Sequence, residues 1–442
     1  MRKPFNLLDF TSYEKKFTMN DVYYGVVNEV ASYGKVTENN KGEGLVELRN
    51  VVISMRADPA DLAPTIRPGF SVDFALKELQ WYLSGDCSLE SAMKCTKFWG
   101  KCSDDGETVT SNYGHLLLFK KNERGETPFS YALACLLRSQ GSKKAYLPMF
   151  SNEHAYISKD NPCTQGVLFY VEDNLLHMNV YMRSNDLWFG FTYDVIWYKV
   201  LYHLMLSAYN EILSRTRKKF VPLWGTGVYN HIVGSFHYYK RNEEQLNKML
   251  KECEDNNCNV PNYFGRLSIS GFDKPKSTKY VQVTYTEKFE SREVTLKLEE
   301  PIMNMDRWFM DAAWLESKKS RCLKKHCGAV IVIGGEIVGR GYGDRHGEHG
   351  CDHCARGAKE KFYSDGCYSV HAEMHALFDM LKGGKYTLHD MSRATVYVTH
   401  GPCDACCKML NFAGCKHIVY AEDYKTDYTG HWPELNVEKL AQ

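Results

Sequence analysis

The sequence lacks long apolar runs, a strong net charge and internal repeats. Its 442 residues carry 55 basic and 54 acidic side chains, for a net charge of +1. Proteins that bind long nucleic acids usually carry a basic excess, so we expect no such partner. No stretch approaches 18 uncharged apolar residues, and the first residues contain no apolar segment typical of a secretion signal. We therefore expect no membrane span and a cytoplasmic location.

Apolar residues and cysteines, by contrast, are plentiful. The hydrophobic fraction of 44% and the 29 tyrosines suffice for packed cores, and the length suggests two or three domains. Seven of the 16 cysteines fall in residues 1–300 and nine in residues 301–442, together with ten of the 16 histidines. Cysteine combined with histidine in a reducing compartment indicates bound metal more than disulfides.

Hydrophobic periodicity predicts several elements of secondary structure. We expect a helix at 71–85, a long apolar helix at 193–215 and two strands within 165–183. Edge strands are expected within 276–300, and a polar, glycine-rich mobile loop at 34–44. The fold class is mixed α/β (α+β).

A proline marks the expected division of the chain. Pro301 ends the alternating pattern, and a helical segment, NMDRWFMDAAWLESKKSR, follows it. We place a domain boundary near 296–304, which gives an N-terminal domain of residues 1–300 and a C-terminal domain of residues 301–442.

The C-terminal domain contains a metal-binding pattern. His371 opens a helical segment, and Cys403 and Cys406 follow an expected strand at 394–399. One histidine and a C-x-x-C pair supply three ligands to a tetrahedral Zn²⁺ and leave a fourth position for water. Glu373 is placed to act as general acid and base. H-x-E followed by P-C-x-x-C is the signature of zinc deaminases that act on cytosine or adenine, whereas a purely structural zinc is the alternative.

Three segments resemble the deoxycytidylate deaminase family over about residues 304–430: HAEMHALFDML, YVTHGPCDACCKMLNFAGCKHIVYAEDY and CGAVIVIGGEIVGRGYG. The resemblance implies an α/β/α fold and hydrolytic removal of the 4-amino group of dCMP. It implies zinc on His371, Cys403 and Cys406, with Glu373 as proton shuttle. The sequence departs from the family at His375, where asparagine is usual, and at 342–344, where Tyr-Asn-Gly is usual.

A second zinc site is a further expectation, since some deaminases of this family carry a structural zinc. Small buried thiols are the alternative. The residues that could form the site are Cys322, Cys327, Cys351, His353, Cys354 and Cys367.

The N-terminal domain contains a candidate nucleophile and a candidate phosphate site. Cys163 lies in a turn before an expected strand, and a cysteine becomes nucleophilic where its neighbours favour the thiolate. Arg183 and Ser184 end another strand, and a guanidinium beside a hydroxyl suits a phosphate. A buried thiol and a surface charge are the alternatives.

Six motifs occur in an order that resembles thymidylate synthases and the related deoxycytidylate hydroxymethylases over about residues 20–295. They are KELQWYLSGD, NYG, GSKK, NPC, RSNDLWFGFTYD and GSFHYY. The resemblance implies a homodimer or higher oligomer and 5,10-methylenetetrahydrofolate as carbon donor. It also implies attack by Cys163 on C6 of a pyrimidine nucleotide, which makes C5 nucleophilic.

The resemblance also assigns individual residues. Glu78 matches the glutamate that relays protons, and Tyr113 matches the tyrosine near the C5 proton. Lys143 and Lys144 stand where arginines usually reach the phosphate in the partner subunit. The remaining matches are Arg183 and Ser184 for phosphate, Asp186 and Gly190 for folate, and His237 and Tyr239 for the sugar 3′-hydroxyl.

Asp194 is the informative departure, because thymidylate synthases carry asparagine there. A carboxylate accepts a hydrogen bond from the 4-amino group of cytosine, and aspartate is what the cytosine-specific relatives carry. The sequence therefore predicts an enzyme of deoxynucleotide monophosphates with two activities: C5 methylation or hydroxymethylation of dCMP, and C4 deamination of dCMP or its 5-substituted product. The alternatives are a deaminase feeding a dUMP-specific synthase, and a deaminase with an inactive dimerisation or sensing domain.

Overall fold

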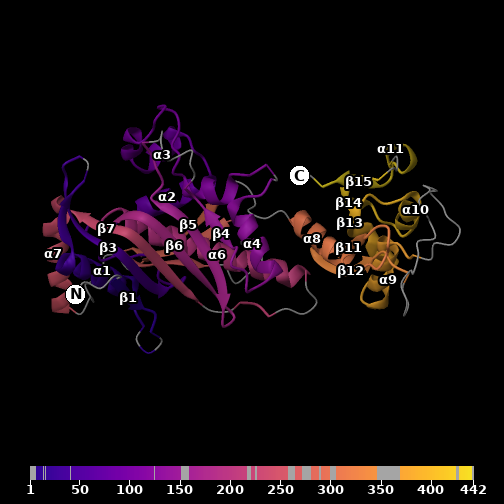
Figure 1. Ribbon diagram of the computed structural model, residues 1–442, viewed down its shortest axis with the longest axis horizontal. Coiled ribbons are helices and arrows are strands. Elements are labelled where there is room, and N and C mark those ends of the chain that lie inside the picture. The colour runs from indigo at the N-terminus through magenta and orange to yellow at the C-terminus, as the bar shows by residue number, and fades with distance from the viewer. Residues whose placement is uncertain are drawn as a thin grey trace. The chain divides into compact units, whose positions relative to one another are not determined.

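The structure is a computed structural model, shown in Figure 1. It describes residues 6–12, 14, 16–39, 41–123, 125–150, 159–216, 221–223, 226–256, 264–270, 280–287, 290–298, 305–345, 369–424 and 428–440. The chain forms two compact units. The first comprises Met1–Asn210 and Pro222–Met303, and the second comprises Glu211–Val221 and Asn304–Gln442.

The first unit is built on a seven-stranded sheet in the order β1-β3-β7-β6-β5-β4, with β2 paired to β3. Most neighbours are antiparallel, but β1 pairs with β3 and β6 with β7 in parallel. A second sheet has the order β10-β9-β8. The strands are β1 (Asn6–Phe10), β2 (Lys35–Glu38), β3 (Gly44–Arg56), β4 (Tyr146–Pro148), β5 (Thr164–Glu172), β6 (Leu175–Asp186), β7 (Val228–Tyr239), β8 (Phe264–Ser270), β9 (Tyr280–Glu287) and β10 (Glu290–Lys297).

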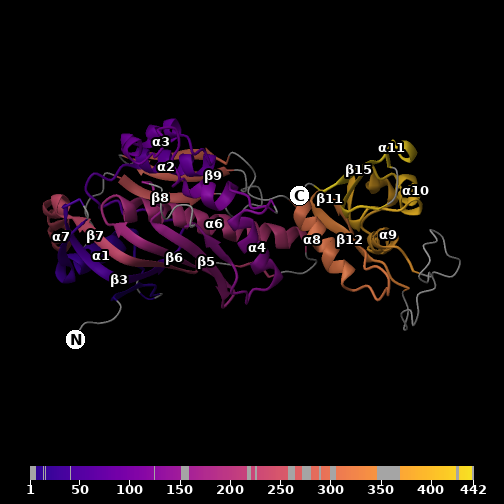
Figure 2. The ribbon, with the colours of Figure 1, turned by 45° about the horizontal axis from the view of Figure 1, so that its top comes forward.

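One long helix forms the centre of this unit. Helix α6 is buried on all sides over most of its length, which explains why its sequence is apolar throughout. Its Tyr198 ring contacts Tyr229 of the large sheet, and its Trp197 ring packs on Tyr82 of α2. Figure 2 shows α6 between the large sheet and α2. The helices are α1 (Met19–Tyr33), α2 (Val72–Ser84), α3 (Leu89–Cys95), α4 (Pro128–Arg138), α6 (Gly190–Thr216) and α7 (Glu243–Asn256), with short helices η1 (Lys97–Lys101), η2 (His115–Phe119) and η3 (Lys240–Asn242).

The helix expected at 71–85 is confirmed as α2, and local chemistry explains both of its ends. Ser71 accepts a hydrogen bond from the backbone N–H of Phe74, which caps the first turn. Gly85 follows the last turn at φ 65°, in the left-handed region that glycine adopts without strain. The same caps fix the position of Glu78 along the helix axis.

The other expected elements of the first unit are confirmed with one exception. The long apolar helix is α6, the two strands of 165–183 are β5 and β6, and the alternating segment forms β9 and β10. Segment 34–44 is not a loop throughout, because Lys35–Glu38 forms β2 and pairs antiparallel with the start of β3. The Asn39 side chain accepts hydrogen bonds from the backbone of Lys41 and Glu43, which closes the turn between the strands.

The second unit has three layers, as the sequence predicts. Its five-stranded sheet has the order β12-β11-β13-β14-β15. Helix α8 packs on one face of the sheet, and α9 and α10 pack on the other (Figure 1). Alternate residues of β11 therefore enter different cores: Ala329 and Ile331 face α9, whereas Val330 faces α8. The elements are α8 (Met305–Ser317), β11 (Gly328–Ile333), β12 (Glu336–Tyr342), α9 (Ala372–Lys382), η5 (Leu388–Arg393), β13 (Ala394–His400), α10 (Asp404–Phe412), β14 (His417–Glu422), α11 (Tyr428–His431) and β15 (Asn436–Lys439).

Glycines let α9 lie directly on the sheet. A Cβ atom on Gly341 would lie 2.2 Å from the backbone oxygen of Ala372 and 2.3 Å from the backbone nitrogen of Ala376. Gly339 faces the next turn of the helix in the same way, 2.3 Å from the oxygen of Ala376. The start of α9, which carries His371 and Glu373, is therefore fixed against β12.

Among the described residues, the structure contains no helix that is both long and apolar enough to span a membrane.

Candidate active sites

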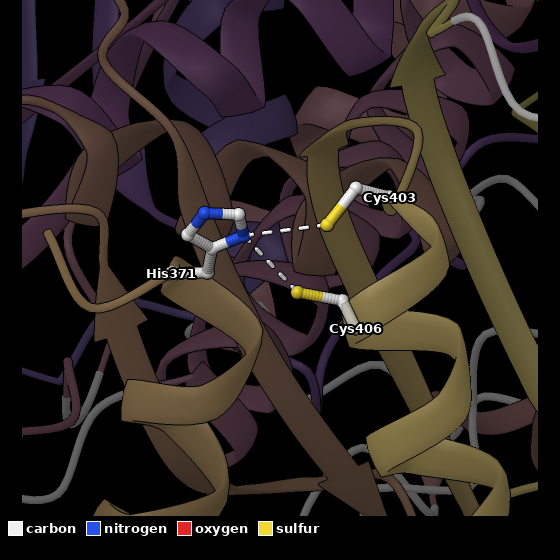
Figure 3. Close-up of side chains that lie close together, drawn as sticks. All are labelled: His371, Cys403 and Cys406. Carbon is white, nitrogen blue, oxygen red and sulfur yellow. Dashed lines mark hydrogen bonds between the residues drawn. The ribbon is translucent and has the colours of Figure 1, made fainter. Parts of the chain in front are cut away.

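Three side chains of the second unit converge at the starts of two helices. His371 directly precedes α9, Cys403 precedes α10, and Cys406 lies in the first turn of α10. The Nδ1 atom of His371 lies 3.3 Å from Sγ of Cys406 and 3.4 Å from Sγ of Cys403 (Figure 3). Among the described residues, this is the one group of three or more His, Cys, Asp or Glu side chains close enough to hold a metal ion, with all ligand atoms within 4.8 Å of one another.

The donor set fits Zn²⁺. Zinc bonds of about 2.3 Å to sulfur and about 2.0 Å to nitrogen place neighbouring tetrahedral ligands roughly 3.5 Å apart, which agrees with the two distances. The hydrogen bond from Cys406, together with that from His371, lowers the pKa of Cys403 to about 4. One thiol of the pair is then a thiolate at neutral pH, the form that binds zinc.

Glu373 lies beside these three residues and is buried, with 5% of its surface exposed. Burial raises the pKa of Glu373, whereas its own backbone N–H and the charge of His371 oppose the rise. A carboxyl group with a raised pKa accepts a proton more readily than an exposed glutamate, which suits a proton shuttle.

The residues that depart from the deaminase pattern make internal contacts. The Nδ1 atom of His375 accepts a hydrogen bond of 3.1 Å from the backbone N–H of Tyr342, which ties α9 to the end of β12. The carboxylate of Asp344, 1% exposed, accepts a 2.8 Å hydrogen bond from Nε of Arg321. The Arg321–Asp344 pair could not be foreseen from the sequence, because 23 residues separate its members.

The second zinc site remains a prediction. Cys322 and Cys327 are both partly exposed free thiols, and burial raises the pKa of Cys327 to about 12. The other four expected ligands, Cys351, His353, Cys354 and Cys367, lie outside the described residues.

In the first unit, the structure brings Cys163 together with Arg183 and Ser184. Cys163 directly precedes β5, and its backbone oxygen accepts a 2.8 Å hydrogen bond from the backbone N–H of Arg183 on β6. Its Sγ atom lies 3.8 Å from Oγ of Ser184. Burial raises the pKa of the Cys163 thiol, whereas the charge of Arg183 and the hydrogen bond with Ser184 act in the opposite direction.

The guanidinium of Arg183 is held in place by its neighbours. It donates hydrogen bonds of 2.8 Å to the backbone oxygen of Asn161 and 3.3 Å to that of Pro162. A third, of 3.3 Å, goes to Oγ of Ser184. The positive charge is therefore fixed next to the thiol, where it favours the thiolate.

Two carboxyl groups of this unit have strongly raised pKa values. Burial, together with the charge of Asp194, raises the pKa of Glu78 on α2 to about 8. Burial also raises the pKa of Asp194 on α6 to about 7, against a hydrogen bond of 2.6 Å from Asn185. Tyr113 is buried, stacks on Tyr82 and lies within electrostatic reach of Asp194 and Cys163. Carboxyl groups perturbed in this way concentrate at functional sites.

The candidate folate and sugar residues lie together where β6 and β7 end. Asp186 pairs with His237 in the sheet register, and its carboxylate accepts hydrogen bonds from the backbone of Trp188 and Phe189. The rings of His237 and Tyr239 contact edge to face. Gly190 packs closely, since a Cβ there would lie 2.8 Å from Nδ2 of Asn185.

A cavity of about 540 Å³ lies beside the turn that follows Asp186. Trp188 and Phe189 line it together with Arg67, which is 4% exposed. The Nε atom of Arg67 has no hydrogen-bond partner among the described residues, although Nη2 donates to the hydroxyl of Tyr193. Aromatic rings beside an incompletely bonded buried guanidinium suit a flat, polar cofactor such as a folate.

Among the described residues, no hydrogen bond or ion pair joins the side chains of Lys143 and Lys144 to Cys163, Arg183 or Ser184. Both lysines are exposed between α4 and β4, and the hydrogen bonds of Lys144 among the described residues are made by its backbone nitrogen and oxygen.

The comparisons with known proteins identify both units. A family model described as thymidylate synthase matches residues 21–287. The chain belongs to the thymidylate synthase family. A second model, described as the cytidine and deoxycytidylate deaminase zinc-binding region, matches residues 303–422. The protein therefore joins a thymidylate synthase domain to a deoxycytidylate deaminase domain of the zinc-binding type.

Individual relatives fall into the same two groups. The thymidylate synthase part is 27% identical over 184 residues to the deoxycytidylate 5-hydroxymethyltransferase of Enterobacteria phage T4, covering 40% of this chain and 71% of that protein. The deaminase part is 33% identical over 129 residues to the deoxycytidylate deaminase of Mycobacterium phage D29, covering 27% of this chain and 94% of that protein. It is also 35% identical over 134 residues to ComE operon protein 2 of Bacillus subtilis, covering 28% of this chain and 62% of that protein.

Proposed function

We propose that the protein is bifunctional towards cytosine deoxynucleotides. Its N-terminal domain transfers a one-carbon unit from 5,10-methylenetetrahydrofolate to C5 of dCMP, and its C-terminal domain hydrolyses the 4-amino group of dCMP or of the 5-substituted product. The observation that supports the N-terminal half most directly is the partly buried Asp194, a hydrogen-bond acceptor with a pKa of about 7 within electrostatic reach of Cys163 and Tyr113. The relationship to a deoxycytidylate 5-hydroxymethyltransferase supports it.

In the C-terminal domain, His371, Cys403 and Cys406 would hold zinc. When bound, zinc supplies a water molecule with a pKa lowered towards neutrality. Glu373 would carry one proton of the attacking water to N3 of the base. It would then carry the second proton, from the hydroxyl group now bound to C4, to the amine, which leaves as ammonia. The burial of Glu373 suits this role, because the raised pKa lets its carboxylate accept a proton more readily than an exposed glutamate would.

In the N-terminal domain, Cys163 would attack C6 of the base, with Arg183 and Ser184 favouring the thiolate and binding phosphate. The S–C6 bond moves the electrons of the C5–C6 double bond onto C5, which takes up the one-carbon unit and then loses its proton. Glu78 and Tyr113 would take part in removing that proton from C5. Addition of water or of hydride to the exocyclic carbon would then restore the C5–C6 double bond as the S–C6 bond breaks and releases the Cys163 thiolate. His237 and Tyr239 would bind the sugar. Methylenetetrahydrofolate would be held near Asp186, Gly190 and the adjoining cavity.

Incubation of the protein with dCMP and methylenetetrahydrofolate, followed by mass spectrometry of the nucleotides, tests both halves. We expect a folate-dependent mass gain at C5 and, in the presence of zinc, loss of the 4-amino group. Absence of the mass gain would overturn the N-terminal half. Survival of dCMP and 5-substituted dCMP in a zinc-replete assay would overturn the C-terminal half.

We expect the Asp194→Asn variant to prefer dUMP over dCMP. The ratio of its activity on dCMP to its activity on dUMP should be lower than that of the parent by about tenfold or more. A site rejects a base by at least this factor when the hydrogen-bonding edge of the base does not match the donors and acceptors of the site. Release of tritium from C5 of each nucleotide measures the preference, in a Glu373→Gln background that spares dCMP from deamination. Asp173→Asn, in the exposed turn after β5, is the matched control. A variant that still prefers dCMP would contradict the assignment of Asp194.

The proposal includes a homodimer formed through the large sheet. One face of the sheet is covered by α6, but alternate residues on the other face are only half-buried, including Leu168, Tyr181 and Ile232. Apolar side chains on a partly covered sheet face suit a subunit interface, through which Lys143 and Lys144 would reach the partner's phosphate site. Sedimentation equilibrium should give a mass of two chains, and a monomer at micromolar concentration would exclude this arrangement.

A further inference from the structure

A buried histidine of the thymidylate synthase domain is connected to Asp194. His231 on β7 is fully buried, and its ring lies edge to face on Phe191 at 5.1 Å between centroids. Its Nε2 atom lies 3.2 Å from Oδ1 of Asn185, and Nδ2 of Asn185 lies 2.6 Å from Oδ2 of Asp194. On the other side, Nδ1 lies 2.7 Å from the hydroxyl of Tyr229.

While Asp194 is ionised, the chemistry of these groups fixes the direction of every hydrogen bond. An ionised Asp194 only accepts, so Asn185 must present its NH₂ group to Oδ2, and its carbonyl oxygen then faces His231. That oxygen also only accepts, so His231 must carry its proton on Nε2. The unprotonated Nδ1 then accepts from the hydroxyl of Tyr229. All donors point from Tyr229 towards Asp194, and we call this series the donor chain.

Burial keeps the donor chain in this state. Desolvation lowers the pKa of His231 to about 3, so the ring is neutral and carries a single N–H. Desolvation also raises the pKa of Tyr229 well above its usual range, so its hydroxyl remains a donor. Gly190 contributes space, because a Cβ atom at that position would lie 2.8 Å from Nδ2 of Asn185 and 3.5 Å from Oδ2 of Asp194.

We propose that His231 is a positioning residue for base recognition: through Asn185 it occupies one oxygen of the Asp194 carboxylate and leaves the other to accept from the 4-amino group of a cytosine nucleotide. This inference rests on the proposed activity towards dCMP. Among the described residues, the hydrogen bond recorded for Asp194 is the one to Oδ2, which leaves Oδ1 for the nucleotide. An acceptor at that point repels the 4-oxygen of uracil, which is also an acceptor.

The donor chain also opposes the protonation of Asp194. The hydrogen bond from Asn185 acts against desolvation and against the charge of Asp186. A protonated Asp194 would donate to the 4-oxygen of uracil, so loss of the donor chain weakens the preference for cytosine. Among the described residues, the other titratable groups in electrostatic contact with Asp194 are Glu78 and Tyr82 on α2, Tyr113 after it, Cys163 before β5, Tyr198 on α6 and Tyr229 on β7.

The test compares His231→Phe with His231→Gln, both in the Glu373→Gln background, by release of tritium from C5 of dCMP and dUMP across about pH 6 to 9. His231→Phe removes the donor, and we expect the preference for dCMP to fall about tenfold, mainly through KM for dCMP. The midpoint of the pH profile that reports Asp194 should move upwards. His231→Gln retains an N–H donor and should restore both properties. Tyr238→Phe, another buried tyrosine on β7, is the control and should change neither.

The outcomes separate the two proposals. A parent protein that releases no tritium from dCMP overturns the proposed function. A parent that does so, together with a His231→Phe variant of unchanged preference and pH midpoint, overturns only the role of His231. Failure of His231→Gln to restore both properties overturns it as well. Should His231→Phe fail to fold, as seen by thermal melting, Asn185→Leu takes its place with the same expected effects.

Discussion

Replacement of Glu373 by glutamine should lower the rate of dCMP deamination by a factor of about 10²–10⁴, the usual contribution of a general acid and base. Glutamine keeps the size of the side chain but cannot accept the proton of the attacking water. Because Glu373 is not one of the three converging ligand side chains, zinc content should stay at the parental level. Steady-state deamination measured together with metal analysis of the purified protein gives both quantities.

Glu336→Gln is the matched control, since Glu336 begins β12 in the same unit and is exposed. It should leave both the rate and the zinc content unchanged. A Glu373→Gln variant with full zinc and a rate within a few-fold of the parent would remove the proton-shuttle role. Loss of zinc in this variant would instead make Glu373 part of the metal site.

Replacement of Cys163 by alanine should abolish the folate-dependent modification of C5, by a factor on the order of 10⁴ or more, because the reaction loses its nucleophile. Deamination should be unaffected, since the deaminase site lies in the other unit. The measurement is tritium release from C5 of dCMP in the Glu373→Gln background, and deamination of dCMP with Glu373 intact.

The same experiment distinguishes the two roles open to the N-terminal domain. A catalytic domain loses its activity with Cys163, whereas an inactive sensing domain leaves every activity of the chain intact. Cys102→Ala provides the control, since Cys102 is another partly exposed free thiol of the same unit. C5 modification that persists without Cys163 would exclude the nucleophile proposed here.

The zinc ligands could be located from the sequence because their geometry is local. His371 and Cys403 each stand directly before a helix, and Cys406 lies one turn further on. Once the two helices are recognised, spacing alone places the donor atoms, and only the approach of the helices to each other depends on the fold. The ends of α2 are local in the same sense, because Ser71 and Gly85 terminate the helix by themselves.

The donor chain could not be located in this way. His231 occupies a buried position of an alternating strand, where its pattern is that of any core residue. Its contact with Asn185 joins residues 46 apart in the sequence. In the register of β6 and β7, His231 pairs with Val180 and not with Asn185, so the strand pairing does not indicate this contact either. The sequence does not indicate strand β2 within segment 34–44 for a related reason, since this strand is defined by its pairing with β3 and not by its own composition.

The direction of the donor chain bears on how such an enzyme could evolve. An asparagine at position 194 would place its carbonyl oxygen where Oδ2 of Asp194 now accepts from Asn185, and its NH₂ group would turn towards the nucleotide. The donor chain formed by Tyr229, His231 and Asn185 would keep its hydrogen bonds and their direction, with Asn185 donating to the carbonyl oxygen of that amide. With the role that we propose for Asp194, a single substitution would therefore separate a cytosine-reading from a uracil-reading site, and we expect no compensating substitution in the core that supports it.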